Sequence, residues 1–330
     1  MSKDEAQLNL PKDGPGTADS GEVSEGGTAS RPVKIAAVVL TFNRRELLWQ
    51  VLESVMGQTR PVDEIIVVDN ASTDGTPSML REHFPQVTYL LMVENLGPAG
   101  GRAAGMKAAY ERGHGWIWLC DDDILPERTS LERCLESALK LKESRVGIIS
   151  PRCDYTGYAS SGVGYWRARF VPASQSQTTC SYEVDLVTFS GALLSRDGVA
   201  AVGYPRPNYF NSWEDLEYCI RLRAAGYRIF VLPRVLMHHL ADHGGRSLPP
   251  WRGYYQTRNH LAMALEHRSI REIFWWAVRQ VKFVVATVLY LDSKAERIRL
   301  RALGSWHGLR GKMGRTIDPA SYALNRAKPK

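Results

Sequence analysis

The sequence predicts an α/β protein with a mostly parallel central sheet flanked by helices. Short apolar runs typical of buried strands alternate with segments of helical spacing between Val33 and about Ser150. This alternation favours parallel strands joined by crossover helices on both faces of the sheet. Polar residues follow several of the expected strand ends, which is where an open sheet of this kind binds ligands.

The expected elements follow one another in a regular order. Apolar runs predict four buried strands, at Val33–Leu40, Ile65–Val68, Val87–Val93 and Trp116–Cys120. Helical spacing after the first strand is carried by Leu47, Leu48, Val51, Leu52 and Val55, and Leu96–Arg112 is rich in Gly and Ala and then helical. The later elements expected are a loop-rich insertion at Tyr155–Tyr182, a strand at Val184–Leu194, a helix at Glu214–Ala225 ended by Gly226, a strand at Tyr227–Leu232, and helices from about Gly253 onward.

Composition divides the chain into three parts. Residues 1–31 are rich in Gly, Ser, Thr and acids and contain no apolar run, so we expect a disordered leader and not a secretory signal. Residues 32–245 hold the α/β pattern, and residues 246–330 form a helical, basic C-terminal region. The five cysteines include no CxxC pair, which favours a reducing, cytoplasmic setting over a disulfide framework or a zinc ribbon.

The net charge of +7 is concentrated at the C-terminal end, where residues 268–330 contain 14 Lys and Arg against 4 Asp and Glu. Such a tail predicts an anionic partner, either lipid headgroups or nucleic acid; a solvated basic helix face is the alternative. Within it, Ile270–Leu291 has no charge-free run near the length of about 20 residues that crosses a bilayer. We expect an amphipathic helix there, either packed on the domain or lying at a membrane surface with these aromatic residues in the headgroup region: Trp275, Trp276 and Phe283.

Three consecutive carboxylates, Asp121, Asp122 and Asp123, come directly after the apolar run Trp116–Cys120. Their like charges repel one another, and a divalent cation that prefers oxygen ligands, Mg²⁺ or Mn²⁺, would relieve that repulsion. Alternate spacing lets Asp121 and Asp123 face the same side and share one ion. A solvated acidic loop that caps the following helix is the simpler alternative.

Two further motifs carry titratable groups. Glu214 and Asp215 open an expected helix, where carboxylates either cap the helix N-terminus or act as a general base toward a hydroxyl group. His238 and His239 follow the next strand, and a neutral imidazole is able to complete a metal site. Adjacent side chains on an extended chain point in opposite directions, so at most one of the two is expected to be a ligand.

The segment Glu94–Arg102 is rich in glycine and precedes a helix. Its glycines let backbone N–H groups approach a phosphate, and a helix N-terminus favours an anion. The spacing is neither GxGxxG nor that of a Walker A loop, and a tight structural turn is the alternative.

Taken in order, these motifs resemble family 2 glycosyltransferases of the GT-A fold. The resemblance covers roughly Val33–Leu240 and rests on Val38–Arg44, Ile65–Thr76, Asn95–Gly101, Asp121–Asp123, Ser190–Ala192, Trp213–Glu217, Arg221, Gly226, Tyr227 and His239. It implies a catalytic domain over residues 32–245 that moves a sugar from a nucleotide-diphosphate donor to another sugar and inverts the anomeric centre.

The resemblance also implies a role for each matching residue. The residues implied to line the donor pocket are Thr41, Asn43, Arg44, Asp69, Asn95, Arg102 and Asp122, with Asp69 on the base. The DxD pair that would hold Mn²⁺ or Mg²⁺ on the diphosphate is Asp121 and Asp123, with His239 as the third protein ligand. Asp215 would be the catalytic base, and Glu214 is its nearest rival.

A narrower likeness points to galactofuranosyl- and rhamnosyltransferases of cell-envelope glycan assembly. It rests on Asn95–Gly101, Trp116–Asp123, Tyr254–Asn259 and Gly308–Gly314. Those relatives use glycan or polyprenyl-diphosphate-linked acceptors at the inner face of the membrane, which fits a basic, Trp-rich C-terminal region in peripheral contact with anionic lipid and no nucleic-acid partner. The acid motif reads Trp-Glu-Asp where some galactofuranosyl relatives have Trp-Asp-Asp, so the implied donor is UDP-galactofuranose first and dTDP-rhamnose second.

Other protein classes fit the sequence less well. A nucleotidyltransferase would carry a Gly-rich, basic loop after the first strand, and a dinucleotide oxidoreductase would carry GxGxxG there, but that place holds Thr41–Arg44. A basic membrane- or nucleic-acid-binding module would leave the Asp, His and Glu-Asp motifs unexplained.

Overall fold

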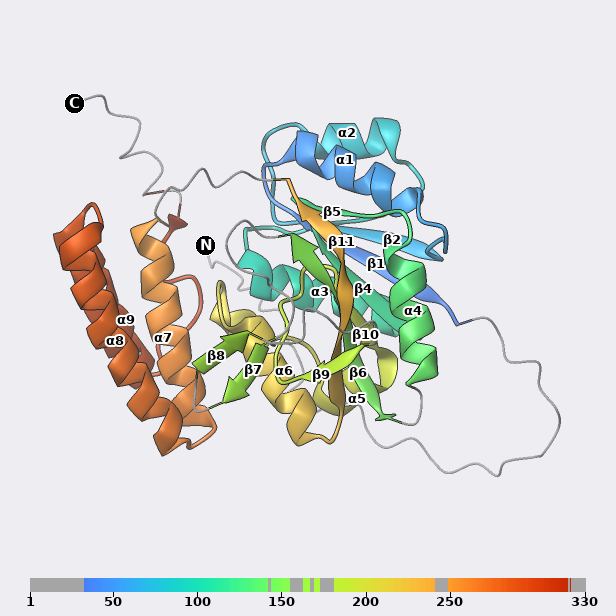
Figure 1. Ribbon diagram of the computed structural model, residues 1–330. Helices are drawn as coiled ribbons and strands as arrows, with labels where there is room; N and C mark the ends of the chain where they lie inside the picture. Colours follow the sequence, from blue (N-terminus) through green and yellow to red (C-terminus); the bar gives the residue numbers. More distant parts are fainter. Residues whose placement is uncertain are drawn as a thin grey trace, which may run out of the picture.

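A curled sheet with helices on both faces forms the body of the protein, as the computed structural model shows (Figure 1). The structure describes residues 33–141, 144–154, 163–166, 169–172, 181–240, 249–319 and 321. The predicted leader at residues 1–31 lies outside the described residues, as do residues 241–248, 320 and 322–330. The predicted α/β class is confirmed.

The first half of the sheet is parallel. Its strand order is β3 (Thr88–Leu91), β2 (Glu64–Asp69), β1 (Ile35–Thr41) and β4 (Trp116–Asp121), with every pairing parallel. The connecting helices are α1 (Arg45–Met56), α2 (Thr76–His83) and α3 (Gly97–Glu111). Strands joined in this way all end at the same edge, so the residues that follow them are brought together.

The second half of the sheet is mixed in direction. Beyond β4 come β10 (Leu193–Ser195), β6 (Val146–Asp154), β11 (Arg228–His239) and β5 (Ile124–Pro126), with β9 (Tyr182–Val184) also paired to β11. Only β6 and β11 are parallel here; the other pairs are antiparallel. The helices of this half are α4 (Ser130–Lys140), α5 (Arg196–Val202) and α6 (Glu214–Ala224), and a short 3₁₀ turn, η2, spans Pro207–Tyr209.

Three sequence predictions need correction in this half. The single strand expected over Val184–Leu194 is wrong, because β9 and β10 are separate strands in different places of the sheet. The segment between them turns at Gly191, which has a φ of 79° and packs against Met237. In the loop-rich insertion expected at Tyr155–Tyr182, two strands, β7 (Val163–Trp166) and β8 (Arg169–Pro172), pair antiparallel in a separate sheet. Residues 155–162, 167–168 and 173–180 of this insertion lie outside the described residues. The strand expected to end at Leu232 continues to His239.

Alternate residues of β1 face two separate hydrophobic cores. Ile35, Ala37 and Val39 pack on the side of α1, α2 and α4, whereas the residues between them pack on the side of α3 and α6. A strand covered on both faces has no need of polar residues, which explains why β1 reads as a continuous apolar run. The sheet is therefore a rigid platform for the polar residues at its edge.

The C-terminal region is a group of three helices: α7 (Pro250–Glu266), α8 (Ile270–Tyr290) and α9 (Lys294–Leu309). A Cβ atom added to Gly304 or Gly308 of α9 would lie less than 3.0 Å from a backbone oxygen of α7, so these glycines allow the two helices to approach closely. In Figure 1 α7 lies between the sheet and the α8–α9 pair, which forms the outer edge of the molecule. In the described part of the chain, α8 alone has the length and apolar composition of a membrane-crossing helix.

Candidate active site

The carboxyl ends of three parallel strands bring the predicted site residues together. Thr41 at the end of β1 lies opposite Asp69 of β2, and Leu40 lies opposite Asp121 of β4. Asp121 therefore lies beside the end of β1, and the acidic triplet that it begins is next to the turn that contains Asn43 and Arg44. Sequence order alone predicted this meeting, since parallel strands end at one edge.

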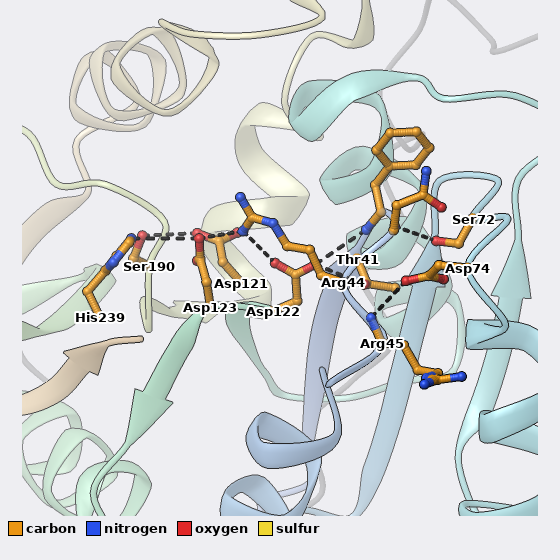
Figure 2. Close-up of polar contacts among 12 residues, drawn as sticks. Thr41, Arg44, Arg45, Ser72, Asp74, Asp121, Asp122, Asp123, Ser190 and His239 are labelled. Atoms are coloured by element: carbon orange, nitrogen blue, oxygen red, sulfur yellow. Dashed lines mark hydrogen bonds and ion pairs between the residues drawn. The ribbon is translucent and has the colours of Figure 1, made fainter. Parts of the chain in front are cut away.

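Asp122 and Asp123 face the β1 turn and bind one arginine (Figure 2). The Thr41 hydroxyl donates to Asp122 at 2.8 Å, and the Arg44 guanidinium contacts both carboxylates, 3.0 Å from that of Asp122. Burial raises the pKa of Asp122 to about 6, although the charge of Arg44 opposes the shift. Arg44 thus pairs with two of the three acids in this structure.

Arg102 of α3 connects the triplet to the acidic helix start. Its guanidinium donates to Asp121 at 2.7 Å and to Glu214 at 2.8 Å, and its side chain is 11% exposed. The Ser190 hydroxyl donates to the other oxygen of Asp121 at 3.0 Å. Burial works against ionisation of Asp121, but the charge and hydrogen bond of Arg102 outweigh it, and its pKa is lowered. Arg102 therefore links Asp121 to Glu214, which lies 112 residues after Arg102 in the chain.

We expect Arg102→Met to lower the free energy of unfolding by about 3–5 kcal/mol, because it leaves buried carboxylates without their cation. The pKa of Asp121 is lowered in the folded protein, so its ionised form adds stability above the ordinary carboxyl pKa, and this contribution is lost as pH falls through the folded pKa. The difference between wild type and variant should accordingly shrink in acid.

Chemical denaturation at pH 7 and at acidic pH measures this effect. The matched control is Arg112→Met, which removes the 3.3 Å ion pair with Glu64 at the exposed end of the same helix and should cost less than about 1 kcal/mol. Equal losses in the two variants would show that Arg102 does not neutralise a buried acidic cluster.

Glu214 and Asp215 begin α6 but differ in accessibility. Glu214 is 3% exposed and bound to Arg102, and among the described residues its second carboxyl oxygen has no hydrogen-bond partner. Asp215 is half-buried, and one of its oxygens accepts from the backbone N–H of Leu216. Burial, followed by the charge of Asp215, raises the pKa of Glu214 to about 7, and burial also raises the pKa of Asp215. Of the two, Asp215 is the carboxylate that an incoming hydroxyl can reach.

The two histidines at the end of β11 point in different directions, as expected of an extended chain. His239 Nε2 lies 3.7 Å from a carboxyl oxygen of Asp123, and the side chain is buried (Figure 2). His238 instead contacts Glu127 at 3.0 Å on the exposed side of the strand. Only His239 is therefore positioned at the acidic edge.

The chemistry of this edge suits a divalent cation. In the part of the chain that the structure describes, no three His, Cys, Asp or Glu side chains are arranged to hold a metal ion. The arginines Arg44 and Arg102 contact the carboxylates instead. The edge nevertheless holds an excess of negative charge, since two guanidinium groups share it with five carboxyl groups, those of Asp121, Asp122, Asp123, Glu214 and Asp215. Carboxylate oxygens and an imidazole are suitable ligands for such an ion, so the residues fit it if Arg44 leaves Asp123.

The other predicted donor residues hold the surrounding loops together. Asn43, with a φ of 53°, accepts from the backbone N–H of Thr73 at 2.7 Å and joins the β1 turn to the β2 turn. Asp69 is fully buried and accepts from Ser72 N–H and the Tyr89 hydroxyl, at 2.8 and 2.9 Å. Asn95 accepts from Gly97 N–H at the start of α3. Their binding of a nucleotide stays a prediction.

A strained loop in front of Glu214 is held by residues that sequence reasoning did not assign to the site. Phe210, Ser212 and Trp213 all have φ between 62° and 74°, which is unfavourable for residues with a Cβ atom. The Asn259 side-chain amide on α7 donates to three backbone carbonyls of this segment at 2.7–3.0 Å, and the neighbouring Arg258 donates to the Tyr209 carbonyl at 2.9 Å. The helix α7 therefore helps to position the start of α6.

The same loop contacts the glycine-rich start of α3. The Phe210 carbonyl accepts from Ala99 N–H at 3.2 Å, and a Cβ atom added to Gly97 would lie 2.1 Å from that carbonyl oxygen. The His260 ring of α7 stacks on Trp213 with centroids 4.1 Å apart. The sequence offered one pointer to α7, the likeness of Tyr254–Asn259 to related transferases, but it did not indicate these contacts; in the structure Arg258, Asn259 and His260 are buried.

Comparison with known proteins shows the family to which this chain belongs. A sequence model described as "Glycosyl transferase family 2" matches residues 36–202. The chain is 33% identical over 201 residues to the galactofuranosyltransferase GlfT1 of Mycolicibacterium smegmatis, a match that covers 58% of this chain and 66% of that protein. The GlfT1 of Mycobacterium tuberculosis is likewise 33% identical over 202 residues, with 58% of this chain and 65% of the relative covered. The chain thus spans just under two thirds of the length of these relatives.

Solved structures are similar in fold at lower identity. One is GalNAc-T7 with UDP, GalNAc and Mn²⁺, with a TM-score of 0.60, 13% identity, and coverage of 91% of this chain and 59% of that chain. Another is the mannosyltransferase PcManGT of Pyrobaculum calidifontis with GDP-Man and Mn²⁺, with a TM-score of 0.52, 18% identity, and coverage of 90% and 80%. The family match and this likeness lead to one conclusion: the chain has the GT-A fold and belongs to glycosyltransferase family 2.

Proposed function

We propose that this protein is an inverting, metal-dependent glycosyltransferase of cell-envelope polysaccharide synthesis. In this proposal galactofuranose passes from UDP-galactofuranose to a glycan or polyprenyl-diphosphate-linked sugar, at the cytoplasmic face of the membrane. The observation that carries the proposal is the meeting of the acidic triplet, His239 and the Glu214–Asp215 helix start around Arg102 and Arg44. The named galactofuranosyltransferase relatives support the donor.

The metal site would consist of Asp121, Asp123 and His239. Solved structures of this fold that contain Mn²⁺ support a divalent cation, either Mn²⁺ or Mg²⁺. When bound, such an ion stabilises the negative charge that develops on the departing nucleotide diphosphate. Arg44 would exchange its contact with Asp123 for the donor phosphates, because guanidinium groups bind phosphate oxygens well.

The donor would lie along the β1 and β2 turns. Its contacts are proposed for Thr41, Asn43, Arg44, Asp69, Asn95, Arg102 and Asp122. Structures of the same fold with UDP or GDP-Man bound support a nucleotide-sugar donor. Fixing the donor against the strand ends would place its anomeric carbon toward the start of α6.

Asp215 would act as the general base. Its half-buried carboxylate would take the proton of the acceptor hydroxyl as that oxygen attacks the anomeric carbon from the face opposite the nucleotide. One displacement of this kind inverts the configuration. Holding both sugars in line would remove a large part of the entropic barrier.

A panel of nucleotide sugars tests the donor, with nucleotide release measured in the presence of a polyprenyl-diphosphate-linked acceptor. We expect UDP-galactofuranose to give the fastest release, at least about tenfold above UDP-glucose, because a pocket that hydrogen-bonds a sugar discriminates strongly against misplaced hydroxyl groups. Faster release with dTDP-rhamnose would identify dTDP-rhamnose as the donor and would leave the proposed sugar-transfer reaction unchanged. Release from none of the nucleotide sugars would contradict the proposed function.

A further inference from the structure

The outer face of α8 is an exposed apolar stripe. Ile270, Phe274, Val281, Val285 and Val288 are each between 48% and 83% exposed. Their separations of four, seven, four and three residues place them on one side of an α-helix. We call these five residues the α8 face.

The opposite side of α8 is fixed to the rest of the protein. Trp276 Nε1 donates to the Thr257 carbonyl of α7 at 3.0 Å, and the Thr257 hydroxyl donates to the Gln280 side chain at 3.0 Å. The Phe283 ring lies under the Arg301 guanidinium of α9 at 3.9 Å. Trp276 and Phe283 therefore face neighbouring helices, and the sequence-based alternative that placed them in a lipid headgroup region is wrong for these two residues.

The surroundings of the α8 face are basic. Residues 270–315 contain ten Lys and Arg against three acids, Glu272, Asp292 and Glu296. Each acid is paired with an arginine: Glu272 with Arg271 at 3.7 Å, and the other two with arginines at 2.7 Å. An apolar stripe in a basic setting matches a bilayer surface that exposes anionic headgroups. A second copy of the chain would instead bring two surfaces of the same charge together.

The polar contacts of α8 also decide how it would meet a bilayer. A span of 21 residues is about 32 Å long, enough to cross the hydrocarbon core. Crossing would put the mid-helix residues Arg279 and Lys282 into hydrocarbon and would separate Trp276 and Gln280 from α7. Lying in the plane of the interface buries the α8 face and keeps those contacts.

We propose that the α8 face docks this protein on an anionic lipid bilayer, with the helix parallel to the membrane surface. The inference rests on the proposed function in one respect, since it supplies the surface on which a lipid-linked acceptor is reached. Ile270, Phe274 and the three valines enter the interface, while Arg271 and Lys282, both exposed beside the stripe, contact the headgroups. No step of the sugar transfer depends on it.

The test is co-sedimentation of the full chain with vesicles of equal parts phosphatidylcholine and phosphatidylglycerol, and with vesicles of phosphatidylcholine alone. Wild type should bind the anionic vesicles and lose binding as salt is raised. Val281→Asn with Val285→Asn should weaken binding at least about tenfold, because two apolar side chains no longer enter the interface. The matched control is Leu91→Asn with Leu139→Asn, two residues of the catalytic body that are 54% and 51% exposed, and it should bind as wild type does.

Other outcomes overturn the inference. Unchanged binding of the α8 variant, or equal loss in the control variant, would show that the α8 face is not the docking surface. Dimers that dissociate in the α8 variant, with no vesicle binding by wild type, would assign the face to a second copy of the chain. Nucleotide release with a soluble acceptor should be unaltered in both variants, so vesicle binding without any release would reject the proposed function and leave the docking surface standing.

Discussion

Asp215→Asn is expected to lower the rate of sugar transfer by about 10²–10⁴-fold while leaving nucleotide binding unchanged. The substitution keeps the shape of the side chain and removes its ability to accept a proton. Asp215 is the accessible acid of the pair, and burial raises its pKa, which makes it a stronger base than an ordinary aspartate. Steady-state transfer together with calorimetric titration of UDP measures both parts of the prediction.

Glu214→Gln serves as the comparison, because the two acids are neighbours at the start of α6. Glu214 is buried against Arg102, and burial together with the charge of Asp215 raises its pKa, which favours its protonated form. We expect this variant to retain more activity than Asp215→Asn. Normal turnover of Asp215→Asn, or the reverse ranking of the two variants, would remove Asp215 as the base.

Loss of either Asp121 or Asp123 is the second prediction with a large effect. Asp121→Asn and Asp123→Asn should each lower transfer by about 10²-fold or more, because charge stabilisation by a metal ion is worth several kcal/mol in the transition state. Each change should also weaken UDP binding in the presence of Mn²⁺ while leaving binding without the ion little altered. Transfer rates and UDP titrations with and without Mn²⁺ measure the split.

The matched control for the metal prediction is Glu127→Gln. Glu127 is an acid close in sequence, on the other side of β11, where it contacts His238 at 3.0 Å. Its removal should leave Mn²⁺-dependent UDP binding as in wild type. If Glu127→Gln weakened it as much as Asp123→Asn does, the effect would be a general loss of negative charge and not the loss of a ligand.

Three strands of the first half, β1, β2 and β4, were predictable because they are covered on both faces. β1, β2 and β4 read as continuous apolar runs, and their chain order fixes the edge at which they end. In the second half of the sheet, β10 has three residues and β11 contains irregular register. Short or bulged strands carry little local sequence pattern. The division of the predicted strand Val184–Leu194 into β9 and β10 therefore became visible only in the tertiary structure.

The site was predictable as a set of acids but not as a network. Asp121, Asp123 and Asp215 were identified from the order of the motifs along the chain. That Asp121 and Asp123 bind a metal ion and that Asp215 is the general base stays a prediction. The bridge through Arg102 depends on how α3 and α6 pack, and the support of Phe210–Trp213 by Asn259 depends on how α7 packs. These contacts join residues 47 to 112 positions apart, and no periodic pattern encodes them.

The orientation of α8 could not be predicted from the sequence either. Its sequence predicts an amphipathic helix, but the pattern alone does not say whether the apolar residues face the protein or a membrane. Contacts with Thr257 of α7 and Arg301 of α9 fix which side of α8 faces the protein, and they leave the five residues of the α8 face exposed.

The proposed reaction depends most on a divalent cation that binds at the carboxyl edge of β4 when a nucleotide diphosphate is present. Electron paramagnetic resonance of free Mn²⁺ tests this directly, with UDP in the absence of protein as the reference. Wild type with UDP should remove more of the free-ion signal than UDP alone, and Asp121→Asn with Asp123→Asn should return the signal to the reference. A signal that wild type leaves at the reference, or that the double variant lowers equally, would contradict the assignment of these carboxylates.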